Sequence, residues 1–238
     1  ANLLTNTVTG LATVNGGTYL ASTATQTFNG GLTISGGIFT GSSGAVDVNG
    51  ILALSSGTLT APSGTFTVSG NWNKTGGTWT PGIYTVVFDG SSAQVITSGA
   101  SAFNNVTFNN TNTNINYTGA LSIGGNVVLS KNTSITSTNN TNLGITGTVN
   151  GGYTLGINSG TGTVTLGGAV GNTTAVNSLS ITGSTINLNG GSITTADVTG
   201  NNVTLTGAVT LGASLTINTN NAVNDGIISI IGAVSAGN

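Results

Sequence analysis

The chain has 238 residues, and its only charged side chains are two Lys and four Asp, because Arg, Glu, His, Cys and Met are all absent. Charged residues make up 3% of the sequence, against about 25% in ordinary globular proteins, and two lysines cannot neutralise a nucleic-acid backbone. The composition therefore excludes nucleic acid as a partner, disulfide cross-links and histidine- or cysteine-based catalysis, and no run of 18 apolar residues predicts a transmembrane helix.

Residues 1–90 repeat with a period of twenty residues. Two series of glycines and three columns of apolar residues recur at this spacing, and a fourth column of Val14, Ile34 and Leu54 is broken by Lys74. The glycines are Gly10, Gly30, Gly50, Gly70, Gly90 and Gly17, Gly37, Gly57, Gly77; the columns are Val8, Phe28, Val48, Val68, Phe88, then Ala12, Leu32, Leu52, Trp72, then Tyr19, Phe39, Leu59, Trp79.

A helical coil of about twenty residues explains this period. Each column then stacks like on like at the strand spacing of about 4.8 Å, and the backbone of each coil bonds to the coils before and after it. Alternation within segments such as 32–34 and 52–54 points one side chain inward and the next outward. The glycines are expected to supply corners with positive φ. The pattern predicts a parallel β-solenoid with three short strands per coil.

Residues 91–142 are less regular than the first ninety. Pairs of apolar residues one position apart still indicate strands, but the Asn- and Thr-rich stretch 109–118 is expected to form a protruding loop. The strand-like positions are Val106 and Phe108, Leu121 and Ile123, Val127 and Leu129, and Ile135.

Residues 143–238 return to three apolar columns, now with steps of about 21–25 residues, still within the range of solenoid repeats. The whole chain is therefore expected to be one all-β solenoid with about 20–24 residues per coil and roughly eleven coils, about 50 Å long. The columns are Leu143/Ile145, Val164/Leu166, Ile186/Leu188, Val209/Leu211, then Leu155/Ile157, Leu179/Ile181, Val203/Leu205, Ile228/Ile230, then Val149, Val170, Ile193, Leu215.

Two stretches, GTWTPGIYTVVFDGSSAQVITSGASAFNNVTF (77–108) and GTVTLGGAVGNTTAVNSLSITGSTINLNGGSITT (162–195), resemble repeats of very long secreted bacterial proteins. The columns as a whole are similar to the β-helical shafts of bacterial surface proteins of the filamentous-haemagglutinin and autotransporter-adhesin type. The resemblance covers nearly the whole chain and implies an extracellular structural or adhesive role. These families share no binding motif that maps onto this sequence.

The sequence offers little to an enzyme. Asp47 and Asp89 fall at different phases of the period, so we do not expect them to meet, whereas Asp197 and Asp225 are separated by one coil and a part of the next, and adjacency is open. We expect each aspartate to bond to local backbone N–H groups in a turn. A Ser–Lys dyad would need Lys74 or Lys131, whose surroundings show no pattern, and the glycines of GGAVG (167–171) lack the lysine and helix of a phosphate loop. No enzymatic activity, cofactor or metal site is predicted.

Two other features have both a purely structural and a functional interpretation. Trp72 and Trp79 lie in apolar columns, which favours core packing over a sugar-stacking platform. Several Asn-x-Ser/Thr strings are expected by chance in a chain so rich in Asn and Thr, and they leave glycosylation open: Asn73, Asn116, Asn132, Asn172 and Asn202.

Both termini continue the pattern without a cap. The sequence enters the repeat directly from Ala1, as a processed protein or a segment of a longer one would, and the apolar segment 226–238 carries no charge. Uncapped coils predict stacking on another copy or on neighbouring repeats. The expected function is a subunit or stalk segment of an extracellular or cell-surface fibre; the alternative is an adhesin or carbohydrate-binding module whose loops (109–118, 137–142 and 218–225), or whose flat Thr and Asn ladders, contact glycans or ice.

Overall fold

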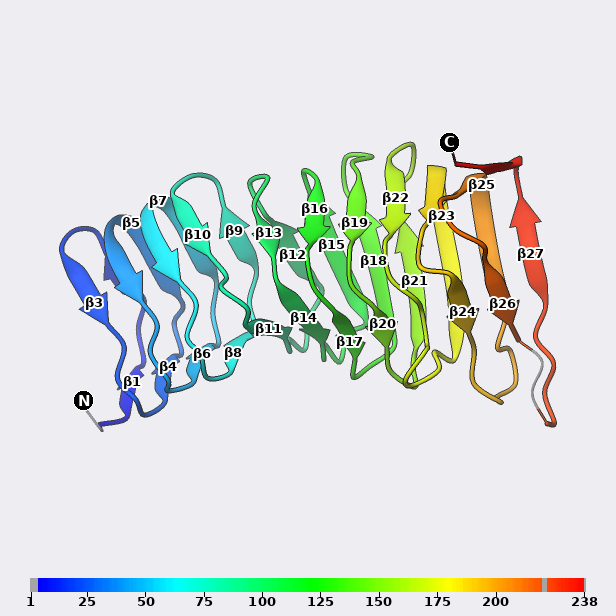
Figure 1. Ribbon diagram of the computed structural model, residues 1–238. Coiled ribbons are helices and arrows are strands. Elements are labelled where there is room, and N and C mark those ends of the chain that lie inside the picture. The colour runs from blue at the N-terminus through cyan, green and yellow to red at the C-terminus, as the bar shows by residue number, and fades with distance from the viewer. Residues whose placement is uncertain (1–3, 220–221, 238) are drawn as a thin grey trace.

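The computed structural model describes residues 4–219 and 222–237. Ala1, part of the expected loop 218–225, and Asn238 at the end of the segment 226–238 lie outside the described residues. The described chain is all β, with parallel strands wound into a solenoid of about 11 turns and about 21 residues per coil (Figure 1). The fold class expected from the twenty-residue period is confirmed.

Each coil contributes to three stacks of strands, and four long strands turn a corner and serve two stacks. The first stack contains β1 (Asn6–Val8), β4 (Gln26–Phe28), β6 (Val46–Val48), β8 (Phe66–Val68), β11 (Thr85–Phe88), β14 (Asn105–Phe108), β17 (Val127–Leu129), β20 (Val149–Asn150), β24 (Ser192–Thr194) and β26 (Thr216–Asn218). Single pairs of Val170 with Val149 and Ile193 connect β20 to β24.

The other two stacks lie on the opposite side of the core. The second contains β2 (Ala12–Val14), β9 (Trp72–Lys74), β12 (Gln94–Thr97), β15 (Asn114–Thr118), β18 (Thr133–Ser137), β21 (Thr154–Asn158) and β27 (Ile228–Ile231). The third contains β3 (Thr18–Leu20), β10 (Thr78–Thr80), β13 (Ala102–Phe103), β16 (Leu121–Ile123), β19 (Leu143–Ile145), β22 (Thr163–Leu166) and β28 (Val234–Ala236). Strands β5 (Leu32–Thr40), β7 (Leu52–Thr60), β23 (Ser178–Leu188) and β25 (Val203–Leu211) run through both. Coil 1 comprises β1–β3, coil 4 comprises β8–β10 and coil 5 comprises β11–β13.

The strand register places the apolar columns of the sequence one above another. Val8 pairs with Phe28, Ala12 with Leu32 and Tyr19 with Phe39, and the same columns continue upward through coils 2 to 4. In the second half the column of single residues differs from expectation at its end. Ile193 pairs with Ile217 rather than with Leu215, because β24 and β26 align two residues further along.

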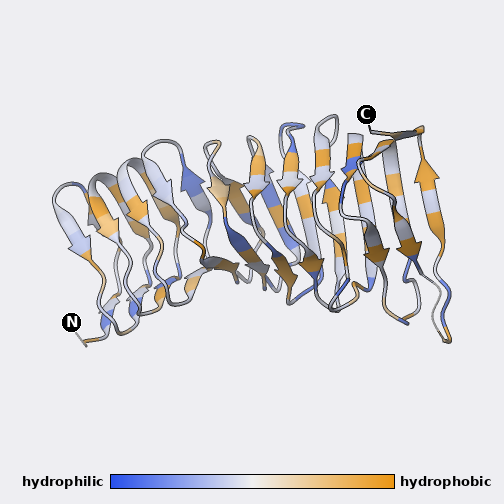
Figure 2. Cartoon of the chain, in the orientation of Figure 1, coloured by the Kyte–Doolittle hydropathy of each residue, from blue (hydrophilic) through white to orange (hydrophobic). Residues whose placement is uncertain are grey.

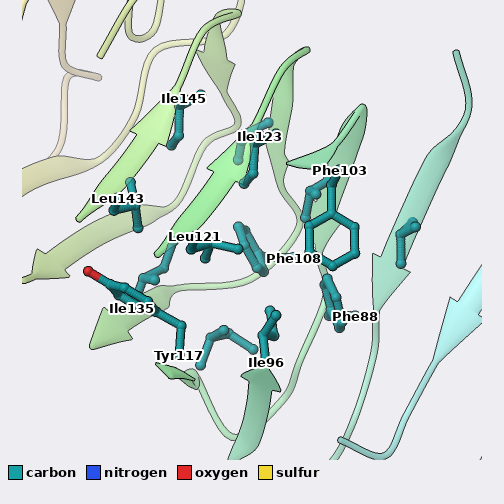
Figure 3. Packing of buried hydrophobic residues seen from close by; sticks show 14 of the residues in the cluster. Phe88, Ile96, Phe103, Phe108, Tyr117, Leu121, Ile123, Ile135, Leu143 and Ile145 are labelled. Atoms are coloured by element: carbon teal, nitrogen blue, oxygen red, sulfur yellow. The ribbon is translucent and has the colours of Figure 1, made fainter. Parts of the chain in front are cut away.

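The buried apolar side chains form one hydrophobic cluster that runs along the rod. Figure 2 shows hydrophobic residues alternating with more polar ones along the strands. The side chains of Phe28, Leu52 and Phe88 are each at most 1% exposed to solvent. Close packing continues into the middle of the rod, where rings and branched side chains from all three stacks interdigitate (Figure 3). Aromatic rings also stack between coils, with centroids 5.2 Å apart for Tyr19 and Phe39 and 6.0 Å for Phe88 and Phe108.

The corner glycines differ from expectation in their backbone. In the second series Gly17, Gly57 and Gly77 have φ between 62° and 75°, but Gly37 does not have a positive φ. No glycine of the first series, Gly10 to Gly90, has a positive φ either. In the first series, glycine is required by lack of space. A Cβ on Gly30 would lie 2.3 Å from the backbone of Gly10 in the coil below, and a Cβ on Gly70 would lie 2.2 Å from the Gly50 carbonyl oxygen. Coils stacked this closely leave no room for a side chain.

The stretch 109–118 is not one protruding loop, contrary to expectation. Its second half is strand β15, whose Ile115 and Tyr117 are fully buried. The turn is confined to 109–113, where Thr113 has a φ of 69°. Alternation of polar and apolar residues in Asn114–Thr118 is a signal for a strand, and the surrounding Asn and Thr residues obscure it.

The cross-section of the solenoid changes between coil 4 and coil 5. In coil 4, the segment that contains the third-stack strand runs from Trp72 to Val86. Trp72 pairs with Ile96 and Val86 pairs with Val106, so the matching segment of the next coil runs only from Ile96 to Val106 and is shorter. The third stack is interrupted as a result: β10 pairs only with β7, and β13 only with β16. Figure 1 shows the rod bending in this region, near β8 and β11.

Candidate functional surfaces

The aspartates lie on the outside of the rod and bond between coils. Asp47 accepts a hydrogen bond from the Thr67 hydroxyl (2.8 Å), and Asp89 accepts one from the Ser69 hydroxyl (2.8 Å), in each case across one coil. Asp47 is in the middle of strand β6 and not in a turn. The expectation of turn aspartates bonded to local backbone N–H groups is therefore wrong for both residues, because stacking brings side chains twenty residues apart into contact.

Asp197 is bonded in the same way at the other end of the rod. Its Oδ1 accepts hydrogen bonds from the backbone N–H (2.8 Å) and the side-chain amide (3.1 Å) of Asn224, 27 residues further on. This contact brings Asp197 to the residue before Asp225, whose own side chain is exposed. Across the described ranges, no three His, Cys, Asp or Glu side chains gather into a group that would hold a metal ion.

A neutral polar plug fills the corner above Gly90. The buried Gln94 side chain donates to the carbonyl oxygens of Val68 (2.8 Å) and Gly70 (2.7 Å), and it accepts from the Gly90 N–H (3.2 Å) and the Asn110 amide (2.7 Å). Every donor and acceptor of this amide is thus used. The plug is a structural element, because it offers neither a charge nor a free polar atom to a substrate.

Tyr117 forms the second buried polar site. Its hydroxyl donates to the Thr141 carbonyl oxygen (2.7 Å) and shares a hydrogen bond of 2.6 Å with Ser159 Oγ. Burial raises the pKa of the Tyr117 hydroxyl, which disfavours a phenolate at neutral pH. The chain has no histidine to act as a base beside these hydroxyls. The cluster ties three consecutive coils together.

The two tryptophans are packed in the core. Trp72 is 1% exposed and Trp79 is 7% exposed, which leaves neither ring free for stacking on a sugar. They meet edge to face at 4.8 Å, and Trp72 meets Phe103 at 4.9 Å. The indole N–H groups of both tryptophans are buried without a hydrogen-bond acceptor. Lys74 is also buried, at the end of the column that it interrupts, whereas Lys131 is exposed.

A groove of about 490 Å³ opens beside β11, next to the change in cross-section. Its apolar lining consists of Ile83, Tyr84 and Val87, and hydroxyl groups come from Ser63, Thr65 and Thr85. Ile83 is 78% exposed, and Tyr84 is half-buried against the core. An aromatic ring flanked by hydroxyl groups and without charges suits a neutral polyhydroxylated ligand.

The two end coils expose apolar side chains. At the first coil Leu11 and Leu20 are 60% and 70% exposed, and at the last coil Ile227 and Ile231 are 67% and 59% exposed. Strands β27 and β28 pair with β25 on one side only, so each has an open edge. Both ends of the described rod therefore present unpaired backbone edges around an apolar cross-section.

The described chain contains no helix that is long and apolar enough to cross a membrane. Several of its outer polar side chains bond to one another between coils, and most of its exposed large apolar side chains lie in the first and last coils. Comparison with known protein families, with curated proteins and with solved structures finds no match to this chain.

Proposed function

We propose that the chain is a structural element of an extracellular or cell-surface fibre, whose rods associate end to end. The observation that carries this proposal is the pair of apolar end faces with open strand edges. We infer that the partner of each end face is the opposite end of a second copy. Such a head-to-tail contact does not close on itself and generates a filament.

The energy of the contact has two sources. Pairing would satisfy the N–H and C=O groups on the open edges of β27 and β28 with those of β2 and β3 from the next copy. Contact would also bury Ile228 and Ile230, which pair with the buried Val203 and Leu205 and are themselves 45% and 39% exposed at the end of the rod. At about 25 cal/mol per Å², hiding a few hundred Å² of apolar surface contributes several kcal/mol, before the entropic cost of association is subtracted.

The charge distribution favours the same contact. Lysines on edge strands commonly oppose edge-to-edge association, and the two lysines here, Lys74 and Lys131, are in coil 4 and between β17 and β18, away from both ends. Asp225 is the one charged residue within fifteen positions of either end of the chain. Little repulsion opposes stacking, and the association should depend only weakly on salt.

Electron microscopy and analytical ultracentrifugation of the purified chain test this proposal. The unchanged protein is expected to form filaments, and the double variant Ile228→Lys, Ile230→Lys is expected to stay monomeric with its central coils folded. A matched control places lysine at two exposed apolar positions outside the end coils, Ile38 in the second coil and Val128 in the seventh, and should polymerise normally. A wild-type chain that remains monomeric at high concentration would show that the proposal is wrong.

The extracellular location is part of the proposal and rests on the resemblance to bacterial β-helical shafts and on the near absence of charge. Antibody labelling of intact producing cells tests it, because an intracellular protein would be labelled only after permeabilisation.

The groove beside β11 favours a second function, a carbohydrate-binding module. Tyr84 and the hydroxyl groups of Ser63 and Thr85 are the residues that would contact a neutral sugar. A glycan array tests this function: binding that is lost in Tyr84→Ala but kept in Tyr153→Ala, a change at another half-buried tyrosine, would support it. An array without any bound glycan would exclude it.

A further inference from the structure

We propose that the junction between coil 4 and coil 5 is a one-sided hinge that divides the rod into two blocks. Coils 3 and 4 are joined by three residue pairs in each of the three stacks. Coils 4 and 5 are joined by three pairs in the first stack, two in the second and none in the third. This junction therefore has about half the backbone pairing of the one before it.

The missing pairs are all on one side, which gives the hinge a direction. The first stack continues unbroken from β8 to β11, and Val86, Val87 and Phe88 pair with residues of both neighbouring coils. The third stack is open between β10 and β13. Bending should therefore open or close the gap between β10 and β13, while the first stack acts as the hinge line.

Aromatic rings cross the open side without a hydrogen bond between them. Phe103 of β13 meets Trp72 at 4.9 Å and Trp79 at 6.3 Å, both between ring centroids. Such ring contacts tolerate small displacements better than a strand ladder, whose hydrogen bonds weaken steeply with distance and angle. The indole N–H groups of both tryptophans have no acceptor, so they add no directional bond across the junction.

The backbone on the open side is a tight turn and not a strand. Gly99 and Ala100 have φ values of 56° and 61°, and they precede the two-residue strand β13. Gly99 lies beside the buried Lys74, where a Cβ would be 2.6 Å from the Lys74 carbonyl oxygen and 3.3 Å from its side-chain nitrogen. Coil 4 thus ends its apolar column with a lysine at the place where the next coil turns away.

Distances between pairs of spin labels measure this hinge directly. The labels can be attached at chosen positions because the chain has no native cysteine. Three double-cysteine variants place labels on outward-facing residues five coils apart, about 24 Å along the stack. Thr18→Cys with Ser122→Cys spans the junction on the third stack, and Thr7→Cys with Thr107→Cys spans it on the first stack. Ala102→Cys with Thr210→Cys lies on the third stack within the second block and serves as the matched control.

The distance distribution of the pair Thr18 and Ser122 is expected to be at least twofold wider than the other two. Equal widths for all three pairs would overturn the hinge, and equal broadening of both pairs that span the junction would overturn its one-sidedness. A second pair on the third stack, Thr58→Cys with Thr165→Cys, also spans the junction and replaces the first if that variant does not fold. Diluting each labelled variant with unlabelled chain restricts the measurement to distances within one rod, whether or not the rods form filaments.

Discussion

Replacing Gly50 by alanine tests how closely the coils are stacked. A Cβ at Gly50 would lie 2.6 Å from the backbone nitrogen of Gly31 and 2.7 Å from the carbonyl carbon of Gly30, where ordinary contact begins at 3.4 Å. The two coils would have to separate by about 0.8 Å at this corner, because a closely packed interior has no spare room for the added atom. Gly10 occupies the same corner of the first coil, where no atom lies within 4 Å of the added Cβ, and it is the matched control.

The expected cost has two parts. Overpacking costs about 1–3 kcal/mol, and stretching neighbouring backbone bonds, such as the one from the Asn49 N–H to the Phe28 carbonyl oxygen (3.0 Å), costs about 1 kcal/mol more. Gly10→Ala should instead be neutral or gain up to about 1 kcal/mol, because alanine restricts the unfolded chain.

Chemical denaturation followed by circular dichroism, on both variants and under conditions that keep the chain monomeric, measures the difference. We expect Gly50→Ala to be less stable than Gly10→Ala by about 2–5 kcal/mol. Equal stability of the two variants would refute the argument, because it would mean that the corner glycines are not required by the stacking distance.

Three further substitutions probe the core and the polar plugs. Leu52→Asp buries a carboxylate and should cost several kcal/mol in denaturant titrations, whereas Ala53→Asp, which faces outward, should cost less than about 1 kcal/mol. Gln94→Leu leaves the Val68 and Gly70 carbonyls without their donor and should lower the free energy of unfolding by about 2–3 kcal/mol. An unchanged free energy of unfolding would contradict the role given to the plug. Because burial raises the pKa of Tyr117, the folded state holds this proton more tightly than the unfolded chain, so stability should be lost as pH rises above about 10. Tyr117→Phe should lose less stability over that alkaline range, as unfolding curves at pH 8 and pH 11 would show.

Most of the fold could be predicted because, in a solenoid, residues separated by one sequence period are neighbours in space. The step of twenty residues from Val8 to Phe28 is also the step between paired residues in space, so periodicity and register are the same information. The same reasoning explains the error at Leu215. The turn before β26 is longer than its predecessor, and Ile217, two residues on and also apolar, takes the place in the column.

The interruption of the third stack could not be predicted from the columns. Trp79 and Phe103 both look like members of one series, and only the shortening of the segment between coil 4 and coil 5 separates their strands. Contacts of outward-facing polar residues are equally hidden in the sequence. Residue type alone favours a turn for Asp47, whereas its partner Thr67 is set by the register of the next coil.

The outer side of the first stack has a consequence for how the surface of this rod can vary. Thr27, Asp47, Thr67 and Val87 occupy the same position in four successive coils, and they include hydroxyl, carboxylate and aliphatic side chains without any change of register. The glycine corner a few residues away accepts no side chain at all. Tolerance to substitution is thus divided sharply within each coil. A rod of this kind can exchange its surface chemistry, position by position, while its frame stays the same.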